Sequence, residues 1–363
     1  MKIAPSHWQA ILQTNVTCPN ELCGILQLPT SIVSTKAMAI QSLNVTRDYL
    51  SRVEIGNPND PLLLQILPTH KELDETPGFS CDPLEEMGGL GRASCKNKIF
   101  NNHADIVSEQ NILRELPVLQ KYPGRALVLA TDSCASNCRF CFRRHFFKKT
   151  VDLEAPEGTQ KQLPNLISFF EQKSDEISSI REIILSGGDP LMLGDVILEG
   201  VLNYIKDLQP GNRVRLHTRL PVMLPERVTP QLIDLLKNFR SRPNDGPVYL
   251  VLHVNHHNEL SEKVLAAIAN FVDAGIPVLS QTVLLRQIND DFETLFDLFE
   301  KLTQNRVIPY YLHQLDRVQG AAHFEVPMAK GAELVTKLRA TLPGYAVPRY
   351  IREISGLSQK TLI

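Results

Sequence analysis

Short apolar runs alternate with longer amphipathic segments from Arg125 onward. Six β-branched apolar runs predict strands at 126–131, 182–186, 213–219, 248–254, 278–284 and 308–315. Apolar residues at helical spacing predict helices near 161–171, 195–206, 230–239, 260–274, 291–303 and 328–342. This alternation indicates parallel strands joined by right-handed crossovers. Six units fall short of a closed eight-stranded barrel, so we predict an α/β fold of the partial (β/α)6 barrel type, with a doubly wound sheet as the alternative.

The first 110 residues follow a different pattern and predict a mainly helical N-terminal segment. Ser6 and Gln9 have the spacing of a capping box at the start of a short helix. Further short helices are expected within 42–53 and at 61–67, the second starting at Pro61. Residues 78–110 lack periodicity and are expected to form a connection. We therefore divide the chain into 1–110, a barrel over 111–343 and a C-terminal segment over 344–363.

Composition and charge exclude several classes of protein. The chain has 363 residues, of which 43% are hydrophobic and 21% charged, as in ordinary globular proteins. A net charge of -2 argues against a nucleic-acid binder. The sequence contains neither a signal-peptide pattern nor an apolar run of about 20 residues, so we expect no membrane role. Seven cysteines, three of them clustered, favour a reducing cytoplasm over a disulfide framework, with Cys18, Cys23, Cys81 and Cys95 read as structural or incidental.

The clustered cysteines are Cys134, Cys138 and Cys141, which directly follow the first predicted strand of the barrel. Their C-x3-C-x2-C spacing places three sulfurs on one short loop. A zinc site usually takes four protein ligands, or three and a water. A [4Fe–4S] cluster held by three cysteines leaves one iron open to a further ligand. A zinc site or a chance grouping of thiols remains the alternative.

Polar residues follow the predicted strands at their carboxyl ends. Ser186, Gly187, Gly188 and Asp189 come after the second strand, and similar clusters follow the third to sixth strands. The carboxyl ends of parallel strands meet at one edge of a sheet, which is where sites form in such folds. We therefore expect the functional site there, beside the cysteine loop.

The cysteine motif after a first strand resembles the radical S-adenosylmethionine (SAM) superfamily. Further motifs are similar to the lysine 2,3-aminomutases of that superfamily, and most similar to the branch that makes (R)-β-lysine for modification of elongation factor P. These motifs are Asp82–Glu86, Cys141–Phe146, Ser186–Leu191, Gln281–Arg286, Pro309–His313 and Gln319–Phe324. The resemblance implies an isomerase acting on L-lysine with a [4Fe–4S] cluster, SAM and pyridoxal phosphate (PLP). It also implies a reductant such as flavodoxin or ferredoxin, and a link to elongation factor P and its ligase.

The resemblance also assigns roles to individual residues. It implies that Lys360 holds PLP, that Tyr122 and Arg125 bind the PLP phosphate, and that Arg143 binds the substrate carboxylate. Asp316 and Glu353 would bind the distal amine of the substrate. The remaining cofactor contacts are expected from Ser186, Gly187, Gly188, Asp189, His253 and Gln281.

The chain departs from the family pattern in three places. Residues 87–110 resemble an insertion, and the sequence given ends at Ile363, shortly after Lys360. The cysteine-rich C-terminal segment of aminomutases acting on free lysine is missing, which favours the elongation factor P branch. The alternatives are a free-lysine or glutamate 2,3-aminomutase of metabolism and, from another class, a non-catalytic iron–sulfur electron-transfer protein.

Overall fold

The computed structural model describes residues 6–86, 118–145, 179–208, 211–239 and 245–363. Within these residues, nine strands form one sheet whose order follows the sequence from β1 to β9. Strands β2 to β8 pair in parallel, whereas β1 and β9 pair antiparallel at the two ends. The strands are β1 Val118–Tyr122, β2 Arg125–Thr131, β3 Glu182–Gly187, β4 Arg213–Thr218, β5 Val248–His253, β6 Val278–Leu284, β7 Ile308–Gln314, β8 Arg349–Arg352 and β9 Thr361–Leu362.

The six predicted strands are present as β2 to β7, and the predicted parallel pairing is confirmed. The bounds of β6 match the prediction, whereas β4 ends at Thr218, so Arg219 lies outside the strand. Strands β1, β8 and β9 were not predicted. The strand order never reverses, so the doubly wound alternative is wrong. The sheet is unclosed and forms a partial barrel.

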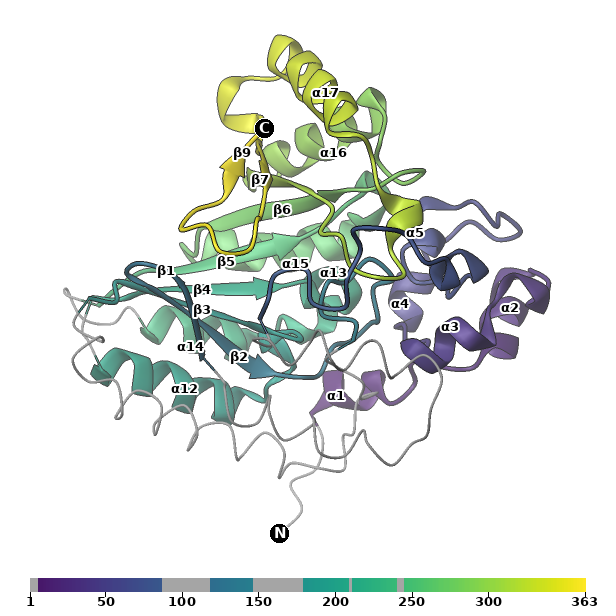
Figure 1. Ribbon diagram of the computed structural model, residues 1–363. Coiled ribbons are helices and arrows are strands. Elements are labelled where there is room, and N and C mark those ends of the chain that lie inside the picture. Colours follow the sequence, from purple (N-terminus) through teal and green to yellow (C-terminus); the bar gives the residue numbers. More distant parts are fainter. Residues whose placement is uncertain (1–5, 87–117, 146–178, 209–210, 240–244) are drawn as a thin grey trace.

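Five long helices connect or follow the parallel strands, as predicted. In Figure 1 they follow the outside of the curved sheet, from α12 at the bottom of the view to α17 at the top. The predicted helix at 161–171 lies outside the described residues. The five are α12 Asp195–Leu208, α14 Pro230–Phe239, α15 Glu262–Asp273, α16 Phe292–Gln304 and α17 Met328–Thr341. A single-turn helix, α13 Leu220–Met223, follows β4 directly.

Residues 6–86 form five short α-helices, coloured purple and blue in Figure 1, where α2 to α5 lie on the right and α1 lies near the lower middle. The predicted capping box is confirmed, since the backbone N–H of Ser6 donates to Oε1 of Gln9 at 2.9 Å. The helix expected at 61–67 is shorter than predicted and is capped by Asp60. These helices are α1 His7–Leu12, α2 Pro19–Leu26, α3 Thr35–Ile40, α4 Arg47–Leu50 and α5 Pro61–Leu64.

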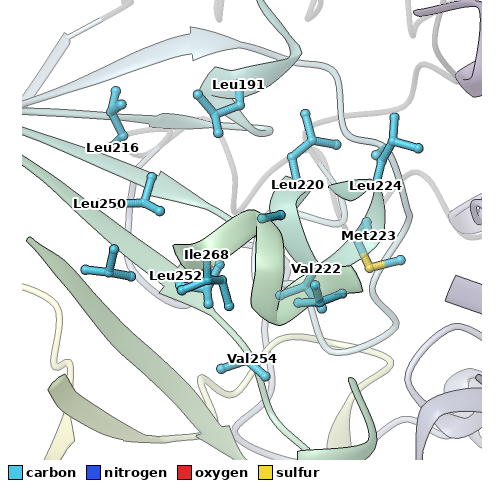
Figure 2. Close-up of a cluster of buried hydrophobic side chains, with 14 of the residues drawn as sticks. Leu191, Leu216, Leu220, Val222, Met223, Leu224, Leu250, Leu252, Val254 and Ile268 are labelled. Carbon is cyan, nitrogen blue, oxygen red and sulfur yellow. The ribbon is translucent and has the colours of Figure 1, made fainter. Parts of the chain in front are cut away.

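One hydrophobic cluster joins the sheet to the helices around it. Leu216 of β4 and Leu250 of β5 are fully buried, as are Val222 of α13 and Ile268 of α15, and Figure 2 shows these side chains gathered together. Fully burying such a side chain stabilises the fold by about 1.5–3 kcal/mol. The same cluster includes Trp8 of α1. The N-terminal helices and the barrel therefore share a core, which fixes both relative to the carboxyl ends of the strands.

In the part of the chain that the structure describes, no helix is long and apolar enough to cross a membrane. The predicted insertion at 87–110, including Cys95, lies outside the described residues.

Candidate active site

A cavity of about 280 Å³ opens at the carboxyl ends of the strands. It brings together all the residues for which the sequence predicts a role. These are Tyr122, Arg125, Cys134, Cys138, Cys141, Arg143, Ser186, Gly187, Gly188, Asp189, His253, Gln281, Asp316, Glu353 and Lys360. They come from seven of the nine described strands or the loops that follow them, so only the folded chain makes them neighbours.

The cysteine loop follows β2 and is held by amide side chains of the N-terminal segment. Nδ2 of Asn44 donates to the carbonyl of Cys134 at 3.2 Å, and Nδ2 of Asn15 donates to the carbonyl of Ala135 at 2.9 Å. Nδ2 of Asn15 also donates to Oδ1 of Asn44 at 2.8 Å. These bonds satisfy carbonyls that a tight loop leaves without backbone partners. No local pattern in the sequence indicates this role, because isolated asparagines are common in loops.

The three thiols are free cysteines that line the cavity. Burial raises the pKa of Cys134 well above its usual value, with a further rise from the neighbouring Cys141, and burial raises the pKa of Cys141 to about 11. Ligation of a metal by these thiols therefore releases protons. Among the described residues, no group of three or more His, Cys, Asp or Glu side chains is placed to hold a metal ion.

The Gly187-Gly188 turn after β3 packs against the start of the cysteine loop. The backbone N–H of Gly188 donates to the carbonyl of Thr131 at 2.6 Å. A Cβ at Gly188 would lie 2.3 Å from the carbonyl oxygen of Ser133, and Gly187 has a φ of +107°. Only glycine allows this approach. Packing between the two loops therefore requires glycine here, and both glycines also line the cavity.

Asp189 uses its carboxylate to hold the segment that follows β4. The carboxylate accepts hydrogen bonds from the hydroxyl of Thr218 at 2.7 Å and from the backbone N–H of Arg219 at 2.8 Å. It also accepts from the N–H groups of Leu191 and Leu220. Burial raises the pKa of this carboxyl, and these donors oppose the rise. Asp189 lines the cavity, but its carboxylate is bonded within the protein.

Arg143 forms a bidentate ion pair with Glu86. Its Nε lies 2.7 Å from Oε2 and its Nη2 lies 3.1 Å from Oε1, and both side chains are buried. Its Nη1 donates to Oγ of Ser186 at 3.0 Å and to the carbonyl of Gly187 at 2.9 Å. Burial raises the pKa of Glu86, but Arg143 outweighs burial and the net pKa is lowered. The sequence singled out both residues but not their pairing.

A row of alternating charges continues from Glu86 to Lys360. Nζ of Lys121 lies 2.8 Å from Oε1 of Glu86 and 3.2 Å from Oε1 of Glu353. Glu353 also pairs with Lys360. Burial raises the pKa of Glu353, but the two ammonium groups outweigh burial and lower the pKa to about 2. Lys121 and Glu86 thus connect the predicted PLP lysine to the predicted substrate arginine, roles that the sequence did not assign to them.

Asp316 and two histidines complete the wall near Lys360. Burial raises the pKa of Asp316 to about 7, and the nearby Glu353 carboxylate adds to the rise. Burial lowers the pKa of His313 to about 3, with a further contribution from Lys360. The buried Nε2 of His217 has no hydrogen-bond partner among the described residues. This wall offers acceptors to a group that enters the cavity.

The remaining predicted residues lie around the rim and floor. Tyr122 ends β1, and burial raises its pKa, with a further rise from Glu353. Arg125 begins β2, pairs with Glu182 at 3.5 Å and is 52% exposed. His253 ends β5 and is in register with Gln281 of β6.

Comparison with known proteins identifies the family. The Radical SAM superfamily profile matches residues 128–299. A Haemophilus influenzae protein named L-lysine 2,3-aminomutase is 35% identical over 358 residues, which cover 98% of this chain and 95% of that protein. The chain belongs to the radical SAM lysine 2,3-aminomutase family. Proteins of the same name from Escherichia coli K12 and Clostridium subterminale are 35% and 32% identical; each alignment covers 98% of this chain, and 93% and 77% of the relatives.

Membership of the radical SAM lysine 2,3-aminomutase family makes the chain an isomerase and implies a [4Fe–4S] cluster and SAM. The cavity fits this requirement, since three soft thiol donors face it from one loop and can each bind a different iron. With three cysteine ligands, one iron of such a cluster remains open.

Proposed function

We propose that this chain is a PLP-dependent lysine 2,3-aminomutase that converts L-α-lysine into β-lysine. The observation that carries the proposal is the single cavity shared by Cys134, Cys138, Cys141 and Lys360. The amine and the thiols lie more than 200 residues apart in the sequence, so a common cavity requires the whole fold. The names of the family relatives support the same activity.

The three cysteines would hold the [4Fe–4S] cluster that the family implies. When bound, the cluster and SAM supply a radical that removes a hydrogen from the substrate, and PLP holds the amino group that moves. The protein must exclude water and other reactants from this space. His217, His253 and His313 line this space, and burial lowers the pKa of each, so these side chains are neutral and add no charge to it.

Lys360 is the residue to which PLP is attached. The fit is supported by the place of its amine in the cavity and by the buried Nε2 of His217, which has no partner among the described residues. Glu353 holds the amine in position before PLP arrives. Tyr122 and Arg125 are available at the rim for the phosphate. Arginine suits a phosphate because its planar fork can make two parallel hydrogen bonds.

The charges of the cavity favour a substrate with a cationic distal end. Glu353 and Asp316 are acids that lie close enough to influence one another. A lysine ammonium would be stabilised between them, whereas the distal carboxylate of glutamate would be repelled. Nη2 of Arg143 carries two N–H groups, and one of them donates to Glu86. We assign the other N–H to the substrate carboxylate. The geometry thus favours lysine over glutamate.

Anaerobic reconstitution tests the proposal. The purified chain is loaded with iron, sulfide and PLP and is then given SAM, dithionite and L-lysine. β-Lysine in the product mixture is the expected result. If the cluster forms but SAM is not cleaved, the chain is instead an iron–sulfur electron-transfer protein. Activity on glutamate alone would overturn the substrate assignment.

The PLP anchor is tested by absorbance, independently of activity. Lys360→Ala is expected to lose the visible PLP band while it keeps the iron–sulfur absorbance. Lys330→Ala is the matched control, because Lys330 pairs with Asp290 at 2.6 Å, is 45% exposed and does not line the cavity. Equal PLP bands in both variants would show that PLP is attached to a lysine other than Lys360.

We further propose that the β-lysine serves the modification of elongation factor P. The motifs that resemble this branch, such as Asp82–Glu86 and Gln319–Phe324, support the proposal. The test adds the product of the reaction to elongation factor P and its ligase and measures the mass of the factor. A mass increase by one lysyl group is expected, and an unchanged mass would favour a metabolic aminomutase.

A further inference from the structure

The guanidinium of Arg219 lies against one of the three cluster cysteines. Arg219 directly follows β4, and its Nη1 donates to Sγ of Cys138 at 2.7 Å. Arg219 is held in this position by hydrogen bonds from its backbone N–H and from both of its Nη atoms.

Arg219 is fixed at both its backbone and its guanidinium. Its backbone N–H donates to the carboxylate of Asp189 at 2.8 Å. Its Nη2 donates to Oε2 of Glu259 at 2.9 Å and to Oε1 of Gln65 at 2.6 Å. The ring of Phe140 lies 5.6 Å from its Cζ, and the side chain is only 7% exposed. Such a residue has little freedom to leave the sulfur.

Glu259 is itself placed so that it shares Arg219 with Cys138. Its Oε1 accepts from Nε2 of Gln65 at 3.0 Å and from the backbone N–H of Asn255 at 3.0 Å. The carboxylate is fully buried. The guanidinium thus lies between a fixed anion and a ligand sulfur, and the two compete for its positive charge.

A hydrogen bond and a positive charge at a ligand sulfur change the electron affinity of an iron–sulfur cluster. Reduction adds one negative charge to the cluster and its thiolates. A buried N–H donor stabilises that added charge more than it stabilises the oxidised cluster, so it raises the reduction potential. A nearby carboxylate has the opposite effect. Residues that contact metal ligands act in this way on many metal sites.

We propose that Arg219 is a positioning residue that acts through Cys138 to raise the reduction potential of the cluster. Glu259 limits the rise, and Asp189 of the Gly-Gly-Asp turn holds the backbone of Arg219 in place. The electron comes from an external reductant, and Arg219 sets how readily the cluster accepts it. The proposal rests on the cluster assigned under the proposed function.

Potentiometric titration of the reconstituted full chain, followed by electron paramagnetic resonance, tests the proposal. R219M is expected to lower the ratio of reduced to oxidised cluster at least tenfold at a fixed potential, which corresponds to 59 mV for one electron. R219K keeps the charge and is expected to lie between R219M and the unaltered chain. R306M is the matched control, because Arg306 is 56% exposed and pairs only with Asp273 among the described residues.

The variant E259Q gives a second measurement with the opposite sign. It removes the competing anion, so the potential is expected to rise. If Arg219 had a purely structural role, the two variants would not shift the reduction potential in opposite directions. An unchanged potential in an R219M protein with full iron content overturns the proposal. If R219M does not retain the cluster, E259Q alone decides. A higher reduction potential in E259Q supports the proposal, and an unchanged or lower potential overturns it. An unaltered chain that binds no cluster would instead overturn the proposed function.

Discussion

Lys360 and Glu353 face each other across the smallest strand pair of the sheet. Glu353 directly follows β8 and Lys360 directly precedes β9, and these strands pair antiparallel through Arg352 and Thr361. The pairing fixes the two backbones and brings the ammonium onto the carboxylate. The amine that we assign to PLP is therefore positioned by the sheet before any cofactor binds.

Glu353→Gln is expected to weaken the binding of lysine. The amide cannot form a charged pair with the substrate ammonium, and a hydrogen bond to a charged group is worth about 1.5–3 kcal/mol. We expect KM for lysine to rise at least tenfold, with a smaller change in kcat. Steady-state kinetics of the reconstituted enzyme measures both. Glu333→Gln is the control, since Glu333 is an exposed carboxylate paired with Lys337 at 2.8 Å. Equal KM values for the two variants would show that Glu353 does not bind the substrate.

Asp316→Asn is expected to stabilise the cofactor-free protein above neutral pH. The pKa of Asp316 is raised to about 7 by burial and by Glu353. A carboxyl with a higher pKa in the folded state contributes stability below its unfolded pKa of about 3.9, and this stability is lost as the pH rises through about 7. Asparagine stays neutral and escapes the loss.

Unfolding of the Asp316→Asn protein by urea at pH 5 and at pH 8 measures this effect. The free energy of unfolding of the variant should exceed that of the unaltered chain by about 2–4 kcal/mol at pH 8, and by less at pH 5. A difference that does not change with pH would show that Asp316 titrates normally.

Gly188→Ala is expected to displace the cysteine loop. The added Cβ would lie 2.3 Å from the carbonyl oxygen of Ser133, and backbone cannot yield as a flexible side chain does. Overpacking of this kind costs about 1–3 kcal/mol. We expect a lower iron content per chain after reconstitution and a lower melting temperature. Gly194→Ala is the control, because no atom lies within 4 Å of a Cβ there. Full iron content in Gly188→Ala would contradict the packing argument.

Asn44→Ala is expected to loosen the same loop from its other side. The carbonyl of Cys134 loses its partner, and an unsatisfied buried group costs about 1–3 kcal/mol. We expect the loaded cluster to lose iron faster in air, which the decay of its visible absorbance measures. Asn270→Ala on the exposed face of α15 is the control and should decay as the unaltered chain does. Identical decay in both variants would show that the N-terminal segment does not support the loop.

Local patterns were enough to predict the barrel elements. The bounds of β6 and α14 match the prediction, because the apolar spacing that defines them lies within each element. The strands β1 and β8 were missed because they are short and carry charged residues such as Lys121 and Arg349. Such strands depend on pairing with neighbours, and a single sequence does not reveal the partner.

The site was predictable as a set of residues but not as a network. The motifs contained both Arg143 and Glu86, yet their pairing joins positions 57 residues apart and leaves no local signal. The amide clamp of Asn15 and Asn44 is equally invisible, since a lone asparagine has many possible partners. Hydrogen bonds between distant side chains arise from the tertiary fold, so they appear only when the fold is known.

The close approach of Gly188 to Ser133 has a consequence for protein engineering. The cysteine loop and the glycine turn touch backbone to backbone, with no room for a methyl group between them. Anyone who transplants the loop into another scaffold to build an iron–sulfur site must transplant the turn as well. The two segments form a single exchangeable module, although 45 residues of sequence lie between Cys141 and Gly187.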